Sequence, residues 1–480
     1  MDLALTVVAS NRGPAVFSPT PGGDLTAARG GGGLVSAISS VLRDSQARWM
    51  ASALSEGDRT FAAANPRGAP VELDGDSYHL SYLALDRRDA QASYNTVANR
   101  TLWFLQHYLF DLARTPRFDA VWWEAWEAYR RVNAAFARAL SEQAPVGGAV
   151  LIQDYHLSLA AMGLRAERDD VRIAHFTHSP WCAPDYFAML PDRAARELLQ
   201  GMLACDLVGF LTPRWADNFS ACARVLLGAQ EIPGGLRVGG RDVRVGVYPL
   251  GVDAPSLVER AQSPDVARHA DMIRARIGDR ALVVRVDRLE LSKNLLRGLA
   301  SYEAFLLTHP EWRGRVVHLI HAYPSRQDLP EYQLYAAEVE AAADAINERF
   351  VEGDWEPVVL DVSDDFPRSL AAMTIADVLV VNPVMDGMNL VAKEGSIVSR
   401  ADTVLVLSRN AGAFPELEPA ALAINPLDVV ETAEAIARAL NMGPEERRSR
   451  ARTLRAAASA WPPSRWLTEQ YADLCEGPRG

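Results

Sequence analysis

The 480-residue chain has 49% hydrophobic and 23% charged residues, a formal net charge of −12 and four widely spaced cysteines. This length predicts two domains of roughly 200 residues each, and the negative charge without a long basic run makes nucleic acid and anionic membranes poor partners. The cysteines form no CxxC pair, and no apolar run approaches the roughly 20 residues of a membrane span, so we expect no zinc site, disulfide framework or membrane anchor. The beginning of the chain shows no export signal, and we expect a cytoplasmic protein.

Short β-branched runs alternate with long helical patterns, which predicts an α/β protein with doubly wound parallel sheets. The predicted strands are Leu3 to Ala9, Ala149 to Gln153, Ile173 to Thr177, Val243 to Tyr248, Ala281 to Val286, Val316 to His321, Val378 to Val381 and Thr403 to Leu407. A Pro and Gly break near Tyr248 to Val252 indicates a boundary between domains 1–250 and 251–460, and a last helix within 461–480, capped by Ser464.

The first predicted strand ends at "SNRG", and "GGGG", Gly30 to Gly33, then opens a helix. Consecutive glycines at a helix N-terminus let backbone amides approach a phosphate. A flexible loop is the alternative, because the spacing fits neither a Walker A motif nor GxGxxG.

Asp154 and His178 follow two successive predicted strands, in "IQDYHL" and "HFTHSPW". In parallel sheets, ligands bind beyond the carboxyl ends of the strands. An acid and an imidazole at neighbouring strand ends could therefore share one site. The alternative is structural, with Asp154 as a helix N-cap and His178 as a buried imidazole.

Arg288 and Lys293 follow a strand of the second half, in "VVRVDRLELSKN". Arginine can bind two phosphate oxygens at once and lysine supplies a compact charge, so this pair suits a diphosphate. A solvated surface pair is the alternative.

The stretch "PVMDGMNLVAKEGS", Pro383 to Ser396, joins a predicted strand to a helix. If the helix starts near Gly387, its first-turn amides, those of Met388, Asn389 and Leu390, are donors for hydroxyl or phosphate oxygens. Asp386 and Glu394 could accept hydrogen bonds from sugar hydroxyls. A helix cap and a surface glutamate are the alternative.

Together these stretches resemble the trehalose-6-phosphate synthases, retaining glycosyltransferases of family 20. The resemblance covers nearly the whole chain, in the order "SNR", "GGLV", "YN", "LW", "DYHL", "HSP", "RLELSK", "SR" and "DGMNLVAKE". It implies the GT-B architecture, in which two Rossmann-like domains face each other across a cleft. It also implies that glucose is transferred from a nucleotide-diphosphate glucose to glucose 6-phosphate.

The resemblance assigns roles residue by residue. It implies catalytic roles for Asp154, His178, Arg288 and Lys293. The acceptor-binding residues would be Arg12, Tyr94, Trp103, Asp154 and Arg326. The donor-binding residues would be Gly32, Gly33, His178, Arg288, Lys293, Asp386, Gly387, Met388, Asn389, Leu390, Val391 and Glu394. No cofactor and no obligatory metal are implied, and a homo-oligomer is possible.

Two positions depart from the family's pattern, Ser52 in place of a second tryptophan and Asn294 after the donor lysine. A third departure is the acidic loop "LDVSDD", Leu360 to Asp365. There Asp364 could accept hydrogen bonds from guanine N1–H and N2–H₂, whereas uracil offers one N–H donor. We therefore expect GDP-glucose over UDP-glucose, with a solvent-facing acidic turn as the alternative.

Three further functions remain open. The acceptor could be glycerol 3-phosphate or a cyclitol phosphate, and the chain could belong to the pseudo-glycosyltransferases, which couple cyclitols through nitrogen. The presence of Tyr94 and His156 favours glucosyl transfer over that last activity. From another class, the chain could be a non-catalytic sugar-phosphate sensor.

Overall fold

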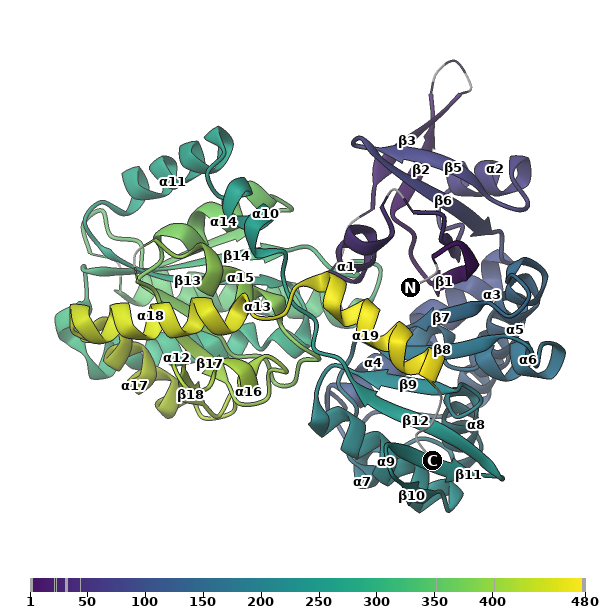
Figure 1. The fold of residues 1–480 in the computed structure, drawn as a ribbon. Helices are drawn as coiled ribbons and strands as arrows, with labels where there is room; N and C mark the ends of the chain where they lie inside the picture. Colours follow the sequence, from purple (N-terminus) through teal and green to yellow (C-terminus); the bar gives the residue numbers. More distant parts are fainter. Residues whose placement is uncertain are drawn as a thin grey trace. The chain divides into compact units, whose positions relative to one another are not determined.

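The computed structural model describes residues 3–20, 22, 24–30, 33–43, 45–350, 352–400 and 402–476. The chain divides into two compact units, 1–250 together with 463–480, and 251–462 (Figure 1). Within the described residues, no helix combines the length and apolar character needed to cross a bilayer.

The first unit is built on one mixed sheet with the strand order β10-β11-β12-β9-β8-β7-β1-β4-β6-β5. Its strands are β1 (Thr6–Ser10), β4 (Arg48–Ser52), β5 (Ala69–Leu73), β6 (Asp76–Leu83), β7 (Ala149–Gln153), β8 (Arg172–Thr177), β9 (Leu207–Phe210), β10 (Gln230–Ile232), β11 (Gly235–Val238) and β12 (Arg241–Val247). A separate antiparallel hairpin, β2 (Ala15–Pro19) and β3 (Leu25–Arg29), projects from this unit (Figure 1).

The helices of this unit run between successive strands. They are α1 (Gly33–Leu42), α2 (Glu56–Ala64), α3 (Arg87–Ala92), α4 (Trp103–Gln106), α5 (Ala120–Gln143), α6 (Ala160–Glu167), α7 (Pro184–Phe187), α8 (Asp192–Met202), α9 (Pro213–Leu227) and α19 (Pro463–Glu476), with the π-helix η2 (Ser93–Leu102) and the short 3₁₀ turns η1 (Leu3–Leu5) and η3 (Tyr155–Leu157). The last helix, α19, yellow in Figure 1, packs on α1, β8 and β9.

The second unit is built on a parallel sheet with the strand order β15-β14-β13-β16-β17-β18. Its strands are β13 (Ala281–Arg288), β14 (Val316–Tyr323), β15 (Val358–Val362), β16 (Val378–Val381), β17 (Val404–Ser408) and β18 (Leu422–Ile424). Its helices are α10 (Ala254–Arg260), α11 (Pro264–Ile277), α12 (Leu295–Thr308), α13 (Pro330–Phe350), α14 (Phe366–Ile375), α15 (Leu390–Val398), α16 (Phe414–Leu417), α17 (Val429–Leu440) and α18 (Pro444–Ala458), with turns η4 (Leu291–Lys293) and η5 (Pro310–Trp312).

Both sheets reverse their strand order at one place. In the first unit, β1 lies between β4 and β7, and in the second, β13 lies between β14 and β16. Successive strands are added outward on one side of the starting strand and then on its other side. Side chains that follow the two central strands meet at this reversal, which is where open α/β sheets bind ligands.

The α/β class expected from the sequence is confirmed, and two local expectations need correction. Leu3–Leu5 forms a 3₁₀ turn, so the first strand begins only at Thr6. The last helix begins at Pro463, which places Ser464 within its first turn and not at its cap. Proline has the backbone angle that a first helical turn requires, so the helix can start there.

Candidate active site

Three predicted residues of the first unit follow adjacent strands of its sheet. Arg12 follows β1, Asp154 follows β7 and His178 follows β8, and these strands are neighbours. The parallel register carries all three to the carboxyl edge, with Arg12 and Asp154 on either side of the reversal. The sheet therefore gathers the side chains that the sequence placed at separate strand ends.

Asp154 is held in an uncommon backbone conformation, with φ 68° and ψ 167°. Non-glycine residues rarely adopt this region, and such strain persists only where the surrounding contacts impose it. Its side chain makes no capping hydrogen bond to η3, so the interpretation as a helix cap is wrong. Instead, Oδ1 accepts a hydrogen bond from the backbone N–H of His178 at 3.2 Å.

The imidazole of His178 is held on two sides. Nε2 lies 3.0 Å from Oε1 of Gln153, and the ring packs against Trp466 of α19 with centroids 5.5 Å apart. Burial lowers the pKa of His178 to about 3, so the ring is neutral at physiological pH. A hydrogen bond to the amide oxygen of Gln153 places the proton on Nε2 and leaves Nδ1 as an acceptor.

Tyr94 lies on η2, a π-helix, a rare geometry that often occurs at functional sites. Its hydroxyl accepts a hydrogen bond from Nη2 of Arg12 at 3.0 Å. Its ring stacks near that of His156, whose Nδ1 lies 4.0 Å from Oδ2 of Asp154. A chain of contacts thus joins Arg12, Tyr94, His156 and Asp154. The sequence used His156 to favour glucosyl transfer but did not place it among the binding or catalytic residues.

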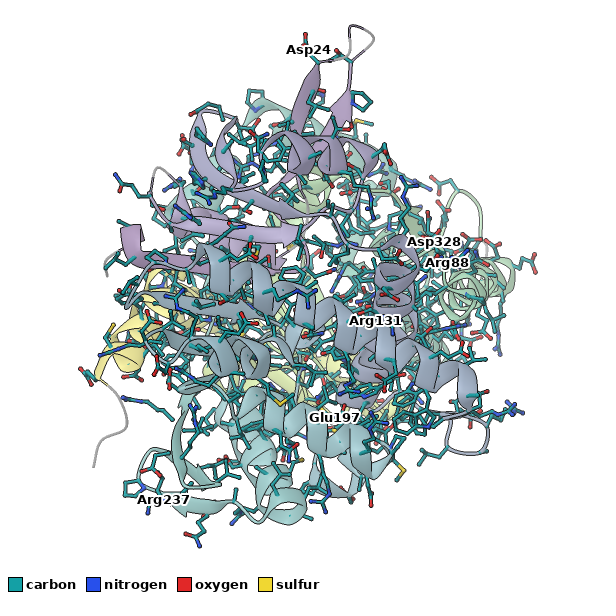
Figure 2. All side chains as sticks on the ribbon, turned by 90° about the vertical axis from the view of Figure 1, so that its right-hand side faces the viewer. Asp24, Arg88, Arg131, Glu197, Arg237 and Asp328 are labelled. Atoms are coloured by element: carbon teal, nitrogen blue, oxygen red, sulfur yellow. The ribbon has the colours of Figure 1, made fainter. Side chains whose placement is uncertain are left out.

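Trp103, which begins α4, is buried and stacks on His107 at a centroid distance of 3.8 Å. The preceding π-helix is fastened to α5 by a hydrogen bond from the indole N–H of Trp122 to Thr101 at 3.0 Å. Figure 2 labels Arg131 of the same helix, which pairs with Asp89 of α3 at 2.6 Å. Helix α5 therefore supports the segment that carries Tyr94 and Trp103.

The glycine run lies where α1 begins. The helix starts at Gly33, one residue before the expected Leu34, and the N–H of Gly30 donates to the carbonyl of Pro14 at 2.7 Å. Gly32, the other predicted donor-binding glycine, lies outside the described residues. The amide of Gly33 is thus at a helix N-terminus, where the dipole favours an anion.

In the second unit, Lys293 and Asp386 meet across the reversal of the strand order. Lys293 ends the turn after β13, Asp386 follows β16, and Nζ lies 2.5 Å from Oδ2. Burial alone would lower the pKa of Lys293, but Asp386 and Asp287 hold it above its ordinary value, so the ammonium stays charged. Asp386 also accepts a hydrogen bond from the side-chain amide of Asn389 at 3.1 Å.

Arg288 and Arg326 share one carboxylate. Nη1 of Arg288 and Nη1 of Arg326 each lie 3.1 Å from Oε1 of Glu290. Glu290 is fully buried, whereas the side chain of Arg288 is 50% exposed. The sequence analysis assigned no role to Glu290, although it stands between Arg288 and Lys293 in the chain.

The segment after β16 forms its helix later than expected. Helix α15 begins at Leu390, because Asn389 takes a left-handed conformation with φ 72° and its Oδ1 caps the N–H of Ala392. The uncapped first-turn amides are therefore those of Leu390 and Val391. Gly387 and Met388 instead form part of the loop before the helix, and its backbone packs closely on Gly412.

A buried ion pair anchors this helix. Nζ of Lys393 lies 2.8 and 2.9 Å from the two carboxylate oxygens of Glu416. The next residue, Glu394, is largely buried, and burial raises its pKa to about 7. Glu394 is therefore poised to lose its proton near neutral pH.

Asp364 lies in the exposed turn between β15 and α14. Its neighbour Asp365 caps α14 by accepting from the N–H of Arg368 at 3.0 Å, which leaves Asp364 the more exposed carboxylate of the two. Burial raises the pKa of Tyr323 to about 12, and the charges of Glu394 and Asp364 act in the same direction. Asp364 and Glu394 thus lie within electrostatic reach of one phenol.

The two departures from the family's pattern have local partners. The hydroxyl of Ser52 donates to Oδ1 of Asn11 at 3.1 Å. Asn294 has φ 63°, and its side-chain amide donates to the carbonyls of Asn382 and Pro426. Each side chain is thus part of the local structure of its own unit.

The whole folded chain matches the family model of glycosyltransferase family 20, over residues 5–476. A bifunctional trehalose-6-phosphate synthase/phosphatase of Thermoproteus tenax is 38% identical over 81% of the chain, and the chain spans about half of that relative, 52%. A trehalose-6-phosphate synthase of Mycobacterium tuberculosis is 34% identical over 99% of the chain and 95% of its own length.

Among solved structures, the chain resembles an alpha,alpha-trehalose-phosphate synthase (UDP-forming) from Burkholderia xenovorans in complex with glucose-6-phosphate. The TM-score is 0.85 and the sequence identity 30%, over 98% of this chain and 99% of that one. This likeness, together with the two Rossmann-like units, confirms the GT-B fold class expected from the sequence.

Proposed function

The chain belongs to glycosyltransferase family 20, and from this premise we propose that it is a retaining glucosyltransferase that makes α,α-trehalose 6-phosphate. The donor is a nucleotide-diphosphate glucose and the acceptor is glucose 6-phosphate. The observation that carries the proposal is the Lys293 and Asp386 pair beside Arg288, which gathers two cations and a sugar-binding carboxylate at the strand reversal of the second unit.

Most of the proposed donor residues belong to the second unit. Arg288 and Lys293 bind the diphosphate, and the amides of Leu390 and Val391 at the start of α15 offer donors to its oxygens. Asp386 binds glucose hydroxyls, Glu394 binds the ribose, and His178 is a further donor-binding residue. Two observations support the roles of Lys293 and Arg288: the ammonium of Lys293 is charged, and half of the Arg288 side chain is exposed.

The acceptor residues are Arg12, Tyr94, Trp103, Asp154 and Arg326. The forked donors of arginine suit a phosphate, which supports acceptor roles for Arg12 and for Arg326. Asp154 accepts a hydrogen bond from an acceptor hydroxyl. Its strained backbone, like the positive φ of 43° at Arg326, is of the kind that concentrates at functional sites.

In the reaction, the bond between the anomeric carbon and the diphosphate oxygen breaks as the acceptor's O1 bonds to the same face of that carbon. The proton of the acceptor hydroxyl passes to an oxygen of the leaving diphosphate. Negative charge grows on the diphosphate, so Arg288 and Lys293 stabilise the transition state more than the ground state. Asp386 and Glu394 hold the substrate and do not act as a glycosidase pair.

Two fixed cations can take the place of a metal ion at the diphosphate, so we propose that no metal is obligatory. Within the described residues, no three histidine, cysteine or carboxylate side chains are grouped as metal ligands. Turnover is expected to be unchanged after treatment with EDTA, and restoration of lost activity by added Mg²⁺ or Mn²⁺ would contradict this expectation.

Two bases, guanine and uracil, are candidates for the nucleotide of the donor. The comparisons do not support the expectation of GDP-glucose, because the synthase from Burkholderia xenovorans described above is named UDP-forming. The exposed carboxylate of Asp364 could accept hydrogen bonds from the guanine N–H groups, so GDP-glucose stays the first candidate. UDP-glucose is the second candidate.

The test is a product assay with glucose 6-phosphate and a panel of UDP-, GDP- and ADP-glucose, read by mass and by the anomeric configuration of the product. Formation of a nonreducing disaccharide phosphate with α,α linkage is expected. Product only with glycerol 3-phosphate or a cyclitol phosphate would assign another acceptor. Binding without any product would assign a sensor.

A further inference from the structure

Glu290 lies among positive charges inside the second unit. Its Oε1 is contacted by Nη1 of Arg288 at 3.1 Å, by Nη1 of Arg326 at 3.1 Å and by the hydroxyl of Ser325 at 2.7 Å. Its other oxygen, Oε2, is buried and has no hydrogen-bond partner among the described residues. One carboxylate oxygen thus joins two guanidinium groups that are 38 positions apart in the chain, at 288 and 326.

This carboxylate is ionised at neutral pH. Burial would raise its pKa, but the positive charges of Arg288, Arg326 and Lys293 lower the pKa of Glu290 to about 2. Two guanidinium groups that contact the same atom would repel each other without a negative charge between them. The carboxylate therefore makes their close approach possible and sets the position of each.

The surroundings of the two arginines differ. The side chain of Arg326 is 10% exposed, and its Nη1 also donates to the hydroxyl of Tyr332 at 2.7 Å. The side chain of Arg288 is 50% exposed, so its guanidinium is held by Glu290 while much of the side chain stays accessible.

We infer that Glu290 is a positioning residue that serves as the shared counter-ion of Arg288 and Arg326. It holds the first guanidinium for the donor diphosphate and the second for the acceptor phosphate, and the inference rests on the function proposed above for these arginines. One buried carboxylate thereby preorganises the cations of both substrates. Its negative charge also keeps the cluster from binding the nucleoside diphosphate product too tightly.

Glu290→Gln tests this role because glutamine keeps the shape and removes the charge. We expect kcat to fall at least tenfold, because the two arginines lose the group that orients them. We expect UDP and GDP to bind roughly threefold to tenfold more tightly, which is the effect of one lost negative charge some 5 Å away in a water-like dielectric. A merely structural role would weaken binding and turnover together.

Glu290→Asp is the matched variant, because it keeps the charge and shortens the side chain. Its affinity for UDP and GDP should stay within twofold of the unaltered enzyme while kcat still falls. Ser325→Ala removes only the hydroxyl that donates to Oε1 of Glu290, and it should lower kcat by a few-fold. This variant tests the same role if the Glu290 variants fail to fold. Glu303→Gln, at a partly exposed pair with Arg349, is the surface control.

The binding constants are measured by calorimetry with UDP and GDP, and kcat in the product assay. If the unaltered enzyme turns over and Glu290→Gln retains kcat within twofold, or if it binds both nucleotides more weakly, the positioning role is overturned and the proposed function stands. If the unaltered enzyme forms no glycosyl product with any donor, the proposed function itself fails.

Discussion

The ammonium of Lys293 and the carboxylate of Asp386 lie 2.5 Å apart, although 93 positions separate them in the chain. Each follows one of the two central strands of the second sheet, β13 and β16, and the reversal of the strand order brings them together. Asp386 keeps the lysine charged in a mostly buried position, where burial alone would favour the neutral amine.

Lys293→Met should remove most of the turnover. The change deletes the charge near the diphosphate and leaves Asp386 without its cation, and we expect kcat to fall roughly 100- to 1,000-fold, the usual cost of losing one preorganised electrostatic contact. Arg288→Ala should have an effect of similar size. The measurement is steady-state kinetics with saturating glucose 6-phosphate.

Arg274→Ala is the control for these two variants, because its side chain is 59% exposed on the same unit. Its kcat should match that of the unaltered enzyme. Full turnover by Lys293→Met would remove the assignment of a transition-state cation to this lysine.

Glu394 should make donor binding depend on pH. With a pKa of about 7, its carboxylate fraction rises from roughly one tenth at pH 6 to nine tenths at pH 8. The ionised form accepts hydrogen bonds from ribose hydroxyls, so we expect donor affinity to rise by up to about tenfold over this interval. Titration of the nucleotide-glucose at several pH values measures it, and Glu394→Gln should show a flat profile. A steep profile in that variant would assign the dependence to another group.

Gln153 should control the protonation of His178. Gln153→Glu places a carboxylate 3.0 Å from Nε2 in the geometry now occupied by the amide, and a nearby negative charge raises a histidine pKa. We expect this variant to lose activity as pH falls from about 7 to 5, whereas the unaltered enzyme keeps a neutral ring there. The measurement is the pH profile of kcat/KM. Gln153→Leu, whose side chain cannot ionise, is the control. Identical profiles for Glu and Leu variants would contradict the prediction.

Asp364 should bias the choice of base. If its carboxylate binds the guanine edge, Asp364→Asn should lower kcat/KM for GDP-glucose by roughly tenfold, in line with the loss of a charge-assisted hydrogen bond, and leave UDP-glucose unchanged. Competition between the two donors in one reaction measures the ratio directly. A clear preference for UDP-glucose in the unaltered enzyme would refute the expectation of GDP-glucose.

The protein should lose stability in mild acid. Burial lowers the pKa of His175 to about 4 and those of His178 and His318 to about 3, from an ordinary value of 6.5. Below pH 6.5 these histidines are protonated in the unfolded chain but stay neutral in the native state. Their contribution to the free energy of unfolding is therefore fully present above pH 6.5. It falls by about 1.4 kcal/mol per histidine for each pH unit below about 6. Between pH 7 and 4.5 the raised pKa of Glu394 increases the free energy of unfolding as pH falls. The opposing effect of the three histidines is larger.

Thermal unfolding between pH 7.5 and pH 4.5 measures this effect. His318→Gln should reduce the pH slope, whereas His309→Gln, at a surface contact with Glu434, should not. An unfolding midpoint that stays constant down to pH 5 would contradict the prediction.

Buried, β-branched strands were the part of the fold that the sequence could predict. The runs of β7, β8, β13, β14 and β16 are rich in apolar residues and largely buried on both faces, a pattern typical of strands in a covered parallel sheet. The edge strands β5 and β10, and β11 beside β10, were missed, because their burial is partial and their short segments carry polar residues. Strands β4 and β9 were also missed, although they are mostly or fully buried. Strand β15 was missed for the same reason, since only its first two residues are buried.

At the site, residues that follow strands could be predicted and their supporting residues could not. Arg288, Lys293, Asp154 and His178 stand beside clear strand patterns, so the general rule of ligand binding at strand ends finds them. Gln153, His156 and Glu290 act through distances that only the folded chain defines. The start of α15 was placed too early, because the left-handed conformation of Asn389 depends on its packing.

The sequence by itself determined the alternation of strands and helices, the class of the fold, the family and the chemical types of residue at each strand end. These follow from local composition and from motifs read in order along the chain. Only the tertiary structure decided which charges neutralise one another, that His178 is neutral and Lys293 charged, and that two arginines share Glu290. Such states depend on burial and on separations of a few ångströms between residues far apart in the chain, because electrostatic energy is set by distance and solvent exposure and not by position in the sequence.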